Sequence, residues 1–119
     1  FERGTPQVTF TNFTLNYAYS FGGGSYFESG QALLQDTLYE ENCAGEAGGA
    51  YFISFGDHSF VRVITRNNCG DGGAIRQDGG VVTLIGPGCV ISENNAVNGG
   101  AVWHVNGETY IQYCYFHDN

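Results

Sequence analysis

Four cysteines are the residues of this chain with the most readily recognised chemistry. They form two pairs of nearly equal spacing, Cys43 with Cys69 and Cys89 with Cys114, which are 26 and 25 residues apart. Two thiols that a fold brings to adjacent positions can be oxidised to a disulfide. Zinc sites typically draw ligands from a C-x-x-C pair, which the sequence lacks. The cysteines therefore favour disulfides, and we expect neither a bound metal nor a cofactor.

Side chains that could support catalysis are scattered along the chain. The nearest groupings are typical of turns and surfaces: Asp57-His58, Asp71 with Asp78, and Glu40-Glu41. The sequence also lacks a G-x-S-x-G motif, which would support a nucleophilic serine. We therefore expect a protein that is not an enzyme.

The charge balance excludes some classes of partner. The 119 residues carry twelve acidic side chains against four arginines and no lysine, which gives a formal net charge of −8. A chain of this sign repels a phosphate backbone, so nucleic acid is not an expected ligand. No apolar run approaches the roughly 20 residues that span a bilayer, so membrane insertion is not expected. Because the chain starts at Phe1 and contains no Met, we expect a processed product or a piece of a longer protein.

Two motifs recur along the chain with a period of about 25 residues. Glycine pairs lie at spacings of 25, 24 and 27: Gly23 and Gly24, Gly48 and Gly49, Gly72 and Gly73, Gly99 and Gly100. Large apolar anchors lie upstream of the pairs and close the chain: Phe13, Leu38, Ile64, Ile91 and Phe116. Each anchor is followed by an asparagine in a turn: Asn16, Asn42, Asn67, Asn94 and Asn119. A fixed period of this length is typical of a repeat architecture.

The repeat predicts an all-β fold. Short β-prone runs lie between the turns, no segment has a helical period, and a unit of this size cannot bury its apolar face alone. The simplest fold that buries the apolar face of every repeat is a right-handed parallel β-helix, or β-solenoid, in which each repeat forms one coil. We expect one domain over residues 1–119, with about four coils at 8–32, 33–58, 59–85 and 86–110 and a partial coil at 111–119.

The motifs resemble a known family. Gly72-Gly73-Ala74-Ile75, together with the F-x-x-N segments 13–16 and 116–119, is similar to the GGAI and FxxN repeats of the chlamydial polymorphic outer-membrane proteins, which are autotransporter passengers. The chain departs from the pattern where Ser25 replaces alanine and where residues 38–41 lack both Phe and Asn. The resemblance implies an exported, passenger-like module used for adhesion or surface structure.

The repeat register pairs the cysteines. Cys43 and Cys69 each lie five residues after an anchor, in a column with Ala18 and Ala96. Cys89 and Cys114 each lie two residues before one. We therefore predict the disulfides Cys43–Cys69 and Cys89–Cys114, which favour an oxidising, extracellular compartment, with buried free thiols as the alternative.

The column of the second cysteine pair contains a conflict. In this register it also holds Asp36 and Arg62, which are costly to bury unless they pair with each other. A bulge that rotates one strand is the alternative explanation, and the sequence does not choose between the two.

The strand after each glycine pair bears most directly on function. If alternation turns one residue of each strand outward, four side chains form a column: Phe27, Phe52, Arg76 and Trp103. This column could contact another subunit, which we favour, could stack against sugars, or could lie under a loop. A register shifted by one residue would instead place these side chains in the core.

The two ends of the repeat point to a function. Val8 and Phe116 lie in segments of the same phase, and neither segment carries a recognisable cap. Uncapped solenoid ends can pair with another copy. We therefore expect a secreted or cell-surface structural or adhesive module that stacks head to tail on itself or forms part of a longer β-helix. Asn12 in Asn12-Phe13-Thr14 is a candidate glycosylation site. The alternative function is a carbohydrate-binding or polysaccharide-acting β-helix.

Overall fold

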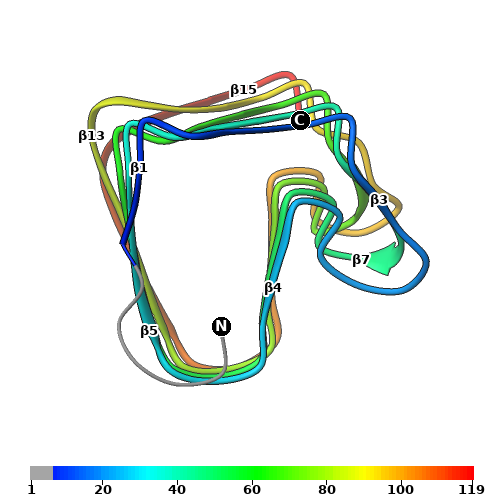
Figure 1. The fold of residues 1–119 in the computed structure, drawn as a ribbon, viewed down its shortest axis with the longest axis horizontal. Helices are drawn as coiled ribbons and strands as arrows, with labels where there is room; N and C mark the ends of the chain where they lie inside the picture. The colour runs from blue at the N-terminus through cyan, green and yellow to red at the C-terminus, as the bar shows by residue number, and fades with distance from the viewer. Residues whose placement is uncertain (1–6) are drawn as a thin grey trace.

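The computed structural model describes residues 7–119, which form a parallel β-solenoid of about four turns (Figure 1). The chain winds clockwise in Figure 1 as its colour passes from blue, nearest the viewer, to red, so the coil is right-handed. Every strand pairing is parallel, as stacked coils require. The predicted fold class is therefore confirmed. Residues 7–119 contain no helix that could cross a membrane.

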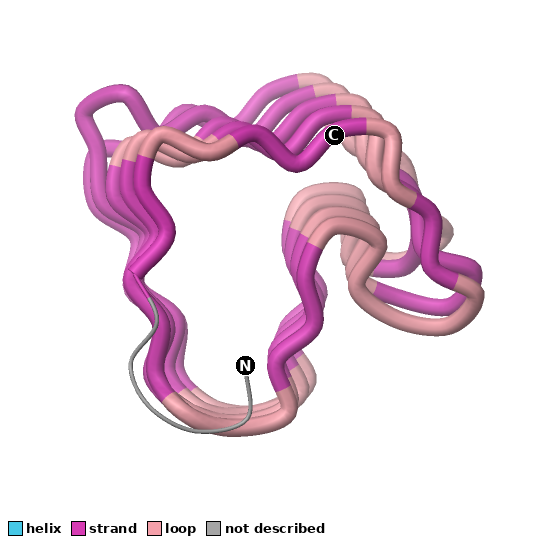
Figure 2. The backbone as a smooth tube through the Cα atoms, in the orientation of Figure 1, coloured by secondary structure: helices cyan, strands magenta, loops and turns pink. Residues whose placement is uncertain are grey.

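The strands make four faces around the solenoid (Figure 2). The first face comprises β1 (Gln7–Thr9), β5 (Gln31–Gln35), β9 (Asp57–Val61) and the first parts of β13 (Val81–Ser92) and β15 (Glu108–His117). The second face comprises β2 (Asn12–Thr14), β6 (Leu38–Glu40), β10 (Ile64–Arg66) and the remaining parts of β13 and β15. A side lobe contains β3 (Tyr17–Ala18), β7 (Cys43–Ala47) and β11 (Cys69–Asp71). The fourth face comprises β4 (Ser25–Phe27), β8 (Tyr51–Ile53), β12 (Ile75–Gln77) and β14 (Val102–His104).

One column of paired residues on the first face marks the coils: Val8, Leu34, Phe60, Leu84 and Ile111. The predicted coil boundaries lie within two residues of this register. The length of the repeat varies for two local reasons. In the lobe, β11 pairs with β7 through a shortened segment, and on β13 the three residues Gly86, Pro87 and Gly88 replace the single residue Arg62 of the coil before.

The inward anchor column differs from the predicted one at two positions. The structure stacks Phe13, Tyr39, Thr65, Ile91 and Phe116. Leu38 and Ile64 pair with Asn12 and Val90 on the outer surface instead. Because successive side chains of a strand alternate between faces, a register error of one residue exchanges inside and outside. Tyr39 and Thr65 are therefore the buried anchors of the second and third coils.

The core consists of apolar columns that run along the solenoid axis. Leu34, Phe60 and Leu84 are fully buried, and burial of one such side chain contributes about 2 kcal/mol. Aromatic rings stack in the neighbouring column, where Phe13 and Tyr39 lie 4.7 Å apart with an interplanar angle of 6°. The Tyr39 hydroxyl is also satisfied, since it hydrogen-bonds to the hydroxyl of Ser25 at 2.9 Å.

The glycine turns confirm three of the four predicted pairs and shift the first. Gly22, Gly48, Gly72 and Gly99 all have positive φ, which glycine adopts without strain. The second glycine of each turn is held by close packing, because a Cβ on Gly49 would lie 2.5 Å from the carbonyl oxygen of Gly73. The first turn is therefore Gly22-Gly23-Gly24, and Gly24 occupies the position of Ala50. Ser25 pairs with Tyr51 and replaces no alanine.

The buried threonines provide a test of this core register. The Thr65 hydroxyl has no hydrogen-bond partner among the described residues, whereas the equally buried Thr37 hydroxyl donates to the carbonyl oxygen of Gln35 at 3.1 Å. We expect Thr65→Val to raise the free energy of unfolding by about 1 kcal/mol, since it removes an unpaired polar group, and Thr37→Val to lower it by about as much. Denaturant unfolding measures both; equal losses for the two variants would contradict the assigned register.

Candidate functional site

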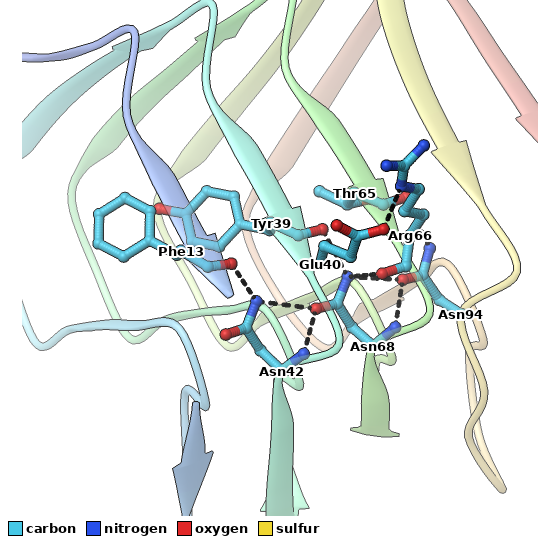
Figure 3. Close-up of polar contacts among 8 residues, drawn as sticks. All are labelled: Phe13, Tyr39, Glu40, Asn42, Thr65, Arg66, Asn68 and Asn94. Atoms are coloured by element: carbon cyan, nitrogen blue, oxygen red, sulfur yellow. Dashed lines mark hydrogen bonds and ion pairs between the residues drawn. The ribbon is translucent and has the colours of Figure 1, made fainter. Parts of the chain in front are cut away.

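An asparagine ladder runs the length of the solenoid at the end of the second face, and Figure 3 shows its three middle members, Asn42, Asn68 and Asn94. It consists of Asn16, Asn42, Asn68, Asn94 and Asn119. The Nδ2 of each member donates to the Oδ1 of the next, at 2.8–3.0 Å. The same Oδ1 accepts the backbone N–H of the preceding member, at 2.9–3.2 Å. The ladder therefore has a direction, with donors pointing toward the C-terminal coil.

Four of the five ladder asparagines also tie their coil to the anchor of the coil before it. Asn42, Asn68, Asn94 and Asn119 donate through Nδ2 to the carbonyl oxygens of Phe13, Tyr39, Thr65 and Ile91, at 2.7–3.2 Å. Asn42 and Asn68 are completely buried, so each of these bonds forms where water cannot replace it. The ladder consequently fixes the register of adjacent coils.

The ladder contains Asn68 in place of the predicted Asn67. Asn67 is exposed and belongs to the preceding corner, where the chain turns through positive φ at Leu15, Glu41, Asn67, Glu93 and Asp118. Asparagine tolerates this left-handed conformation, which explains why two adjacent asparagines occur there. The equal spacing of 26 residues from Asn16 to Asn42, Asn68 and Asn94 would have identified the correct member.

The first predicted disulfide is confirmed and the second is not formed. Cys43 and Cys69 are bonded, with 4.5 Å between their Cα atoms, in a column with Tyr17 and Asn95 instead of Ala18 and Ala96. Cys89 and Cys114 occupy directly paired positions, as predicted, but both are free thiols. Burial raises the pKa of the Cys89 thiol, so it stays protonated and unreactive at neutral pH.

The conflict around Asp36 and Arg62 is resolved by the corrected register. The column of Cys89 contains Thr37 and Val63, while Asp36 and Arg62 lie one residue earlier in a corner with positive φ. There Arg62 donates to both carboxylate oxygens of Asp36, at 2.7 and 2.9 Å. These hydrogen bonds hold the pKa of Asp36 below its usual value. The predicted contact between the two residues is thus correct, and neither side chain is in the core.

The outward column on the fourth face comprises Tyr26, Phe52, Arg76 and Trp103. Phe27 was predicted in this column, but it points inward and is buried. The shift has the same cause as the shifted first glycine turn, because the first glycine pair begins at Gly22, one residue before the predicted Gly23. Phe52, Arg76 and Trp103 lie where the sequence predicted them.

The rings of this column stack on one another along the solenoid axis. Tyr26 and Phe52 are 5.1 Å apart and nearly parallel, and Phe21 from the lobe lies 4.8 Å from Phe52. The Arg76 guanidinium lies 3.8 Å from the Trp103 ring centroid and pairs with Asp78. A sugar platform needs open ring faces, whereas Tyr26 stacks on Phe52 and the Trp103 ring is covered on one face by the Arg76 guanidinium. Phe52 is buried beneath the lobe, as the loop-covered interpretation predicts.

The coil edges carry almost all of the exposed large apolar side chains among residues 7–119. The first coil exposes Phe10, Leu15, Tyr17, Tyr19, Phe21 and Tyr26. The outermost segments at the other end expose Val97, Val105, Tyr110, Ile111, Tyr113 and Tyr115. Phe55 is the exception in an inner coil. A cavity of about 260 Å³ also opens at the first coil, lined in part by Val8, Phe13 and Tyr39.

The predicted glycosylation acceptor can also be placed on the structure. Asn12 is exposed on β2 and points outward, as a glycosylation acceptor must, and its modification stays a prediction. Among residues 7–119, no three His, Cys, Asp or Glu side chains lie close enough together to hold a metal ion.

Comparisons with family models, with curated proteins and with solved structures found no match for this chain. The functional interpretation of this chain therefore depends on the asparagine ladder and the coil edges.

Removing one ladder member should be far more damaging than removing its neighbour. Asn68→Ala removes the side-chain oxygen that accepts from the backbone N–H and the Nδ2 of Asn42, and it removes the donor to the Tyr39 carbonyl, so we expect a loss of about 3 kcal/mol in the free energy of unfolding. Asn67→Gly keeps the positive φ and should change it by less than about 0.5 kcal/mol. Denaturant unfolding of the two variants decides the matter, and similar losses would show that the ladder does not set stability.

A buried histidine should make stability depend on pH. His58 hydrogen-bonds through Nδ1 to the Tyr51 hydroxyl at 2.9 Å and through Nε2 to the Phe55 carbonyl oxygen at 3.2 Å. Burial lowers the pKa of His58, although the nearby Asp57 carboxylate opposes the shift. The unfolded chain therefore binds this proton more readily, and stability falls as pH drops below the ordinary value of about 6.5.

The control for this effect is His58→Gln, which removes the titrating group. Thermal unfolding of both proteins between pH 7 and 5 should show a steeper decline for the original chain. Parallel pH profiles would contradict the burial of a neutral His58.

Proposed function

We propose that this chain is a non-enzymatic, extracellular structural or adhesive solenoid module that associates end to end. The observation that carries the proposal is the chemistry of its two outermost coil edges. Both edges combine unpaired strands with exposed aromatic and aliphatic side chains, and the inner coils are largely free of such exposure.

Apart from Glu108 at the start of β15, the edge strands also lack the protection that soluble β proteins normally provide. Exposed edge strands usually carry charges or proline, which prevent pairing with another chain. Residues 7–16 and 110–116 carry neither. The same columns in inner coils hold charged side chains, which pair as Asp36 with Arg62 and Glu40 with Arg66. This distribution of charge favours association at the edges and a polar surface along the sides.

Three observations support an extracellular setting. The Cys43–Cys69 bond is typical of oxidising compartments, and Asn12 is an accessible acceptor for glycosylation. The GGAI and FxxN motifs resemble those of the chlamydial surface passengers, which would suit a repeat that builds or decorates a cell surface. The carbohydrate-binding alternative has weaker support, because Tyr26 already stacks on Phe52 and Trp103 already lies against the Arg76 guanidinium.

Electron microscopy and analytical ultracentrifugation over a range of concentrations test the proposal. We expect end-to-end oligomers or filaments that grow with concentration. Ile111→Lys should abolish them, because stacking would bury the new charge, whereas isolated chains leave position 111 half exposed. Phe55→Lys adds the same charge at an exposed position of an inner coil and should assemble normally.

Circular dichroism establishes that both variants fold. A chain that stays monomeric at every concentration, or equal loss of assembly in the two variants, would overturn end-to-end association.

A further inference from the structure

We infer that the partner at this edge is a second copy of the chain, which places its β1 and β2 on β15 of the first copy in one register. In that register Gln7 of the incoming copy lies beside Tyr110, and its Asn16 lies beside Asn119. The inference rests on the proposed end-to-end association and adds to it the strands, the direction and the residue pairing.

The register follows from the pairing already present inside one chain. Gln7 pairs with Leu33, Leu33 with Ser59, Ser59 with Thr83 and Thr83 with Tyr110, so the next position in this column belongs to another Gln7. A displacement by one residue would turn every inward side chain of the incoming strands to the outside. The alternation of β15 therefore accepts β1 only in steps of two residues.

The asparagine ladder selects one of these steps and one direction. Every inner member donates forward from Nδ2 and accepts from the member before it. At the C-terminal edge, Asn119 receives the bonds from Asn94 and has no further asparagine to bond among residues 7–119. At the other edge, Asn16 donates to Asn42, and its Oδ1 accepts no hydrogen bond from the described residues. Donors therefore meet an acceptor only when the copies stack head to tail.

The side chains in the other columns are compatible with this pairing. Ile111 would lie on Val8 and Phe116 on Phe13, which continues two apolar columns of the core. Phe13 already stacks on Tyr39 in the same column at 4.7 Å, so a ring on its open face repeats an observed contact. The two outer corners, Tyr113 and Phe10, are exposed aromatic residues that would meet as well.

The contact between the two copies covers only part of the circumference of the coil. Strand β15 lies over β13, while β14 has no strand on its outer side among the described residues. An incoming coil that rests on β15 therefore starts one layer farther from β14. A gap of one strand spacing, about 4.8 Å, keeps its fourth-face strand from pairing with β14. The contact is confined to the first and second faces and to the ladder at their end.

A cysteine trap tests the register directly. Thr11 lies one residue before β2 in the column that continues through Thr37, Val63, Cys89 and Cys114. Stacking as inferred brings position 11 of one copy next to Cys114 of the other, as Cys43 and Cys69 are brought together within one chain. Within a single chain the two positions are four coils apart, about 19 Å, which no disulfide can span.

The experiment uses Thr11→Cys in a Cys89→Ala background, which removes the competing partner of Cys114. Oxidised glutathione supplies the oxidant: two protein thiols lose two electrons and two protons to form one disulfide, and one oxidised glutathione becomes two reduced molecules. The control is Thr9→Cys in the same background, because Thr9 belongs to the outward column of Gln112 and its side chain points away from Cys114.

We expect a series of covalent oligomers on a non-reducing gel for Thr11→Cys, at least tenfold more abundant than for Thr9→Cys. Mass spectrometry of the peptides should identify the linkage between positions 11 and 114. Assembly of both variants with equal or no cross-linking would overturn the register and leave end-to-end association standing. Monomers in both variants and in the unmodified chain would overturn the association itself.

Discussion

The structure depends on one constraint, the hydrogen bonding of a buried asparagine to both of its neighbouring coils. A parallel solenoid has no hairpin turns to fix the alignment of its strands, and a slip of one residue would exchange its core and its surface. Asn42 and Asn68 prevent that slip because each bonds the asparagine after it and the anchor carbonyl before it. Their complete burial makes any misalignment costly, since the displaced amides would lose their partners without access to water.

This constraint explains which parts of the molecule could be predicted from the sequence. Repeated glycine turns and the cysteine spacing predict the parallel coil, the Cys43–Cys69 bond and the pairing of Cys89 with Cys114, but the same spacing also predicts a second disulfide that does not form. Whether a single side chain points inward or outward is harder to predict, because strand alternation has a period of two and the repeat length varies between coils. Apolar character favours Leu38 as an inward anchor, and alternation counted from Gly23-Gly24 turns Phe27 outward. The structure reverses both, and the neighbours Tyr39 and Tyr26 take those places.

The asparagine register also connects stability with assembly. Among residues 7–119, the ladder leaves an acceptor at Asn16 and donors at Asn119. The edge strands lack the charges that inner coils place in the same columns. Residues that would be a liability in a monomer are therefore concentrated where a second copy can cover them. The same interactions that stack the coils within one chain are available between chains.

Hydrogen–deuterium exchange at low and high protein concentration tests this account most directly. The account predicts that amides of β1, β2 and β15 become protected as concentration rises, while those of β14 continue to exchange at the same rate. Protection of β14 instead, or an exchange pattern that does not change with concentration, would contradict it.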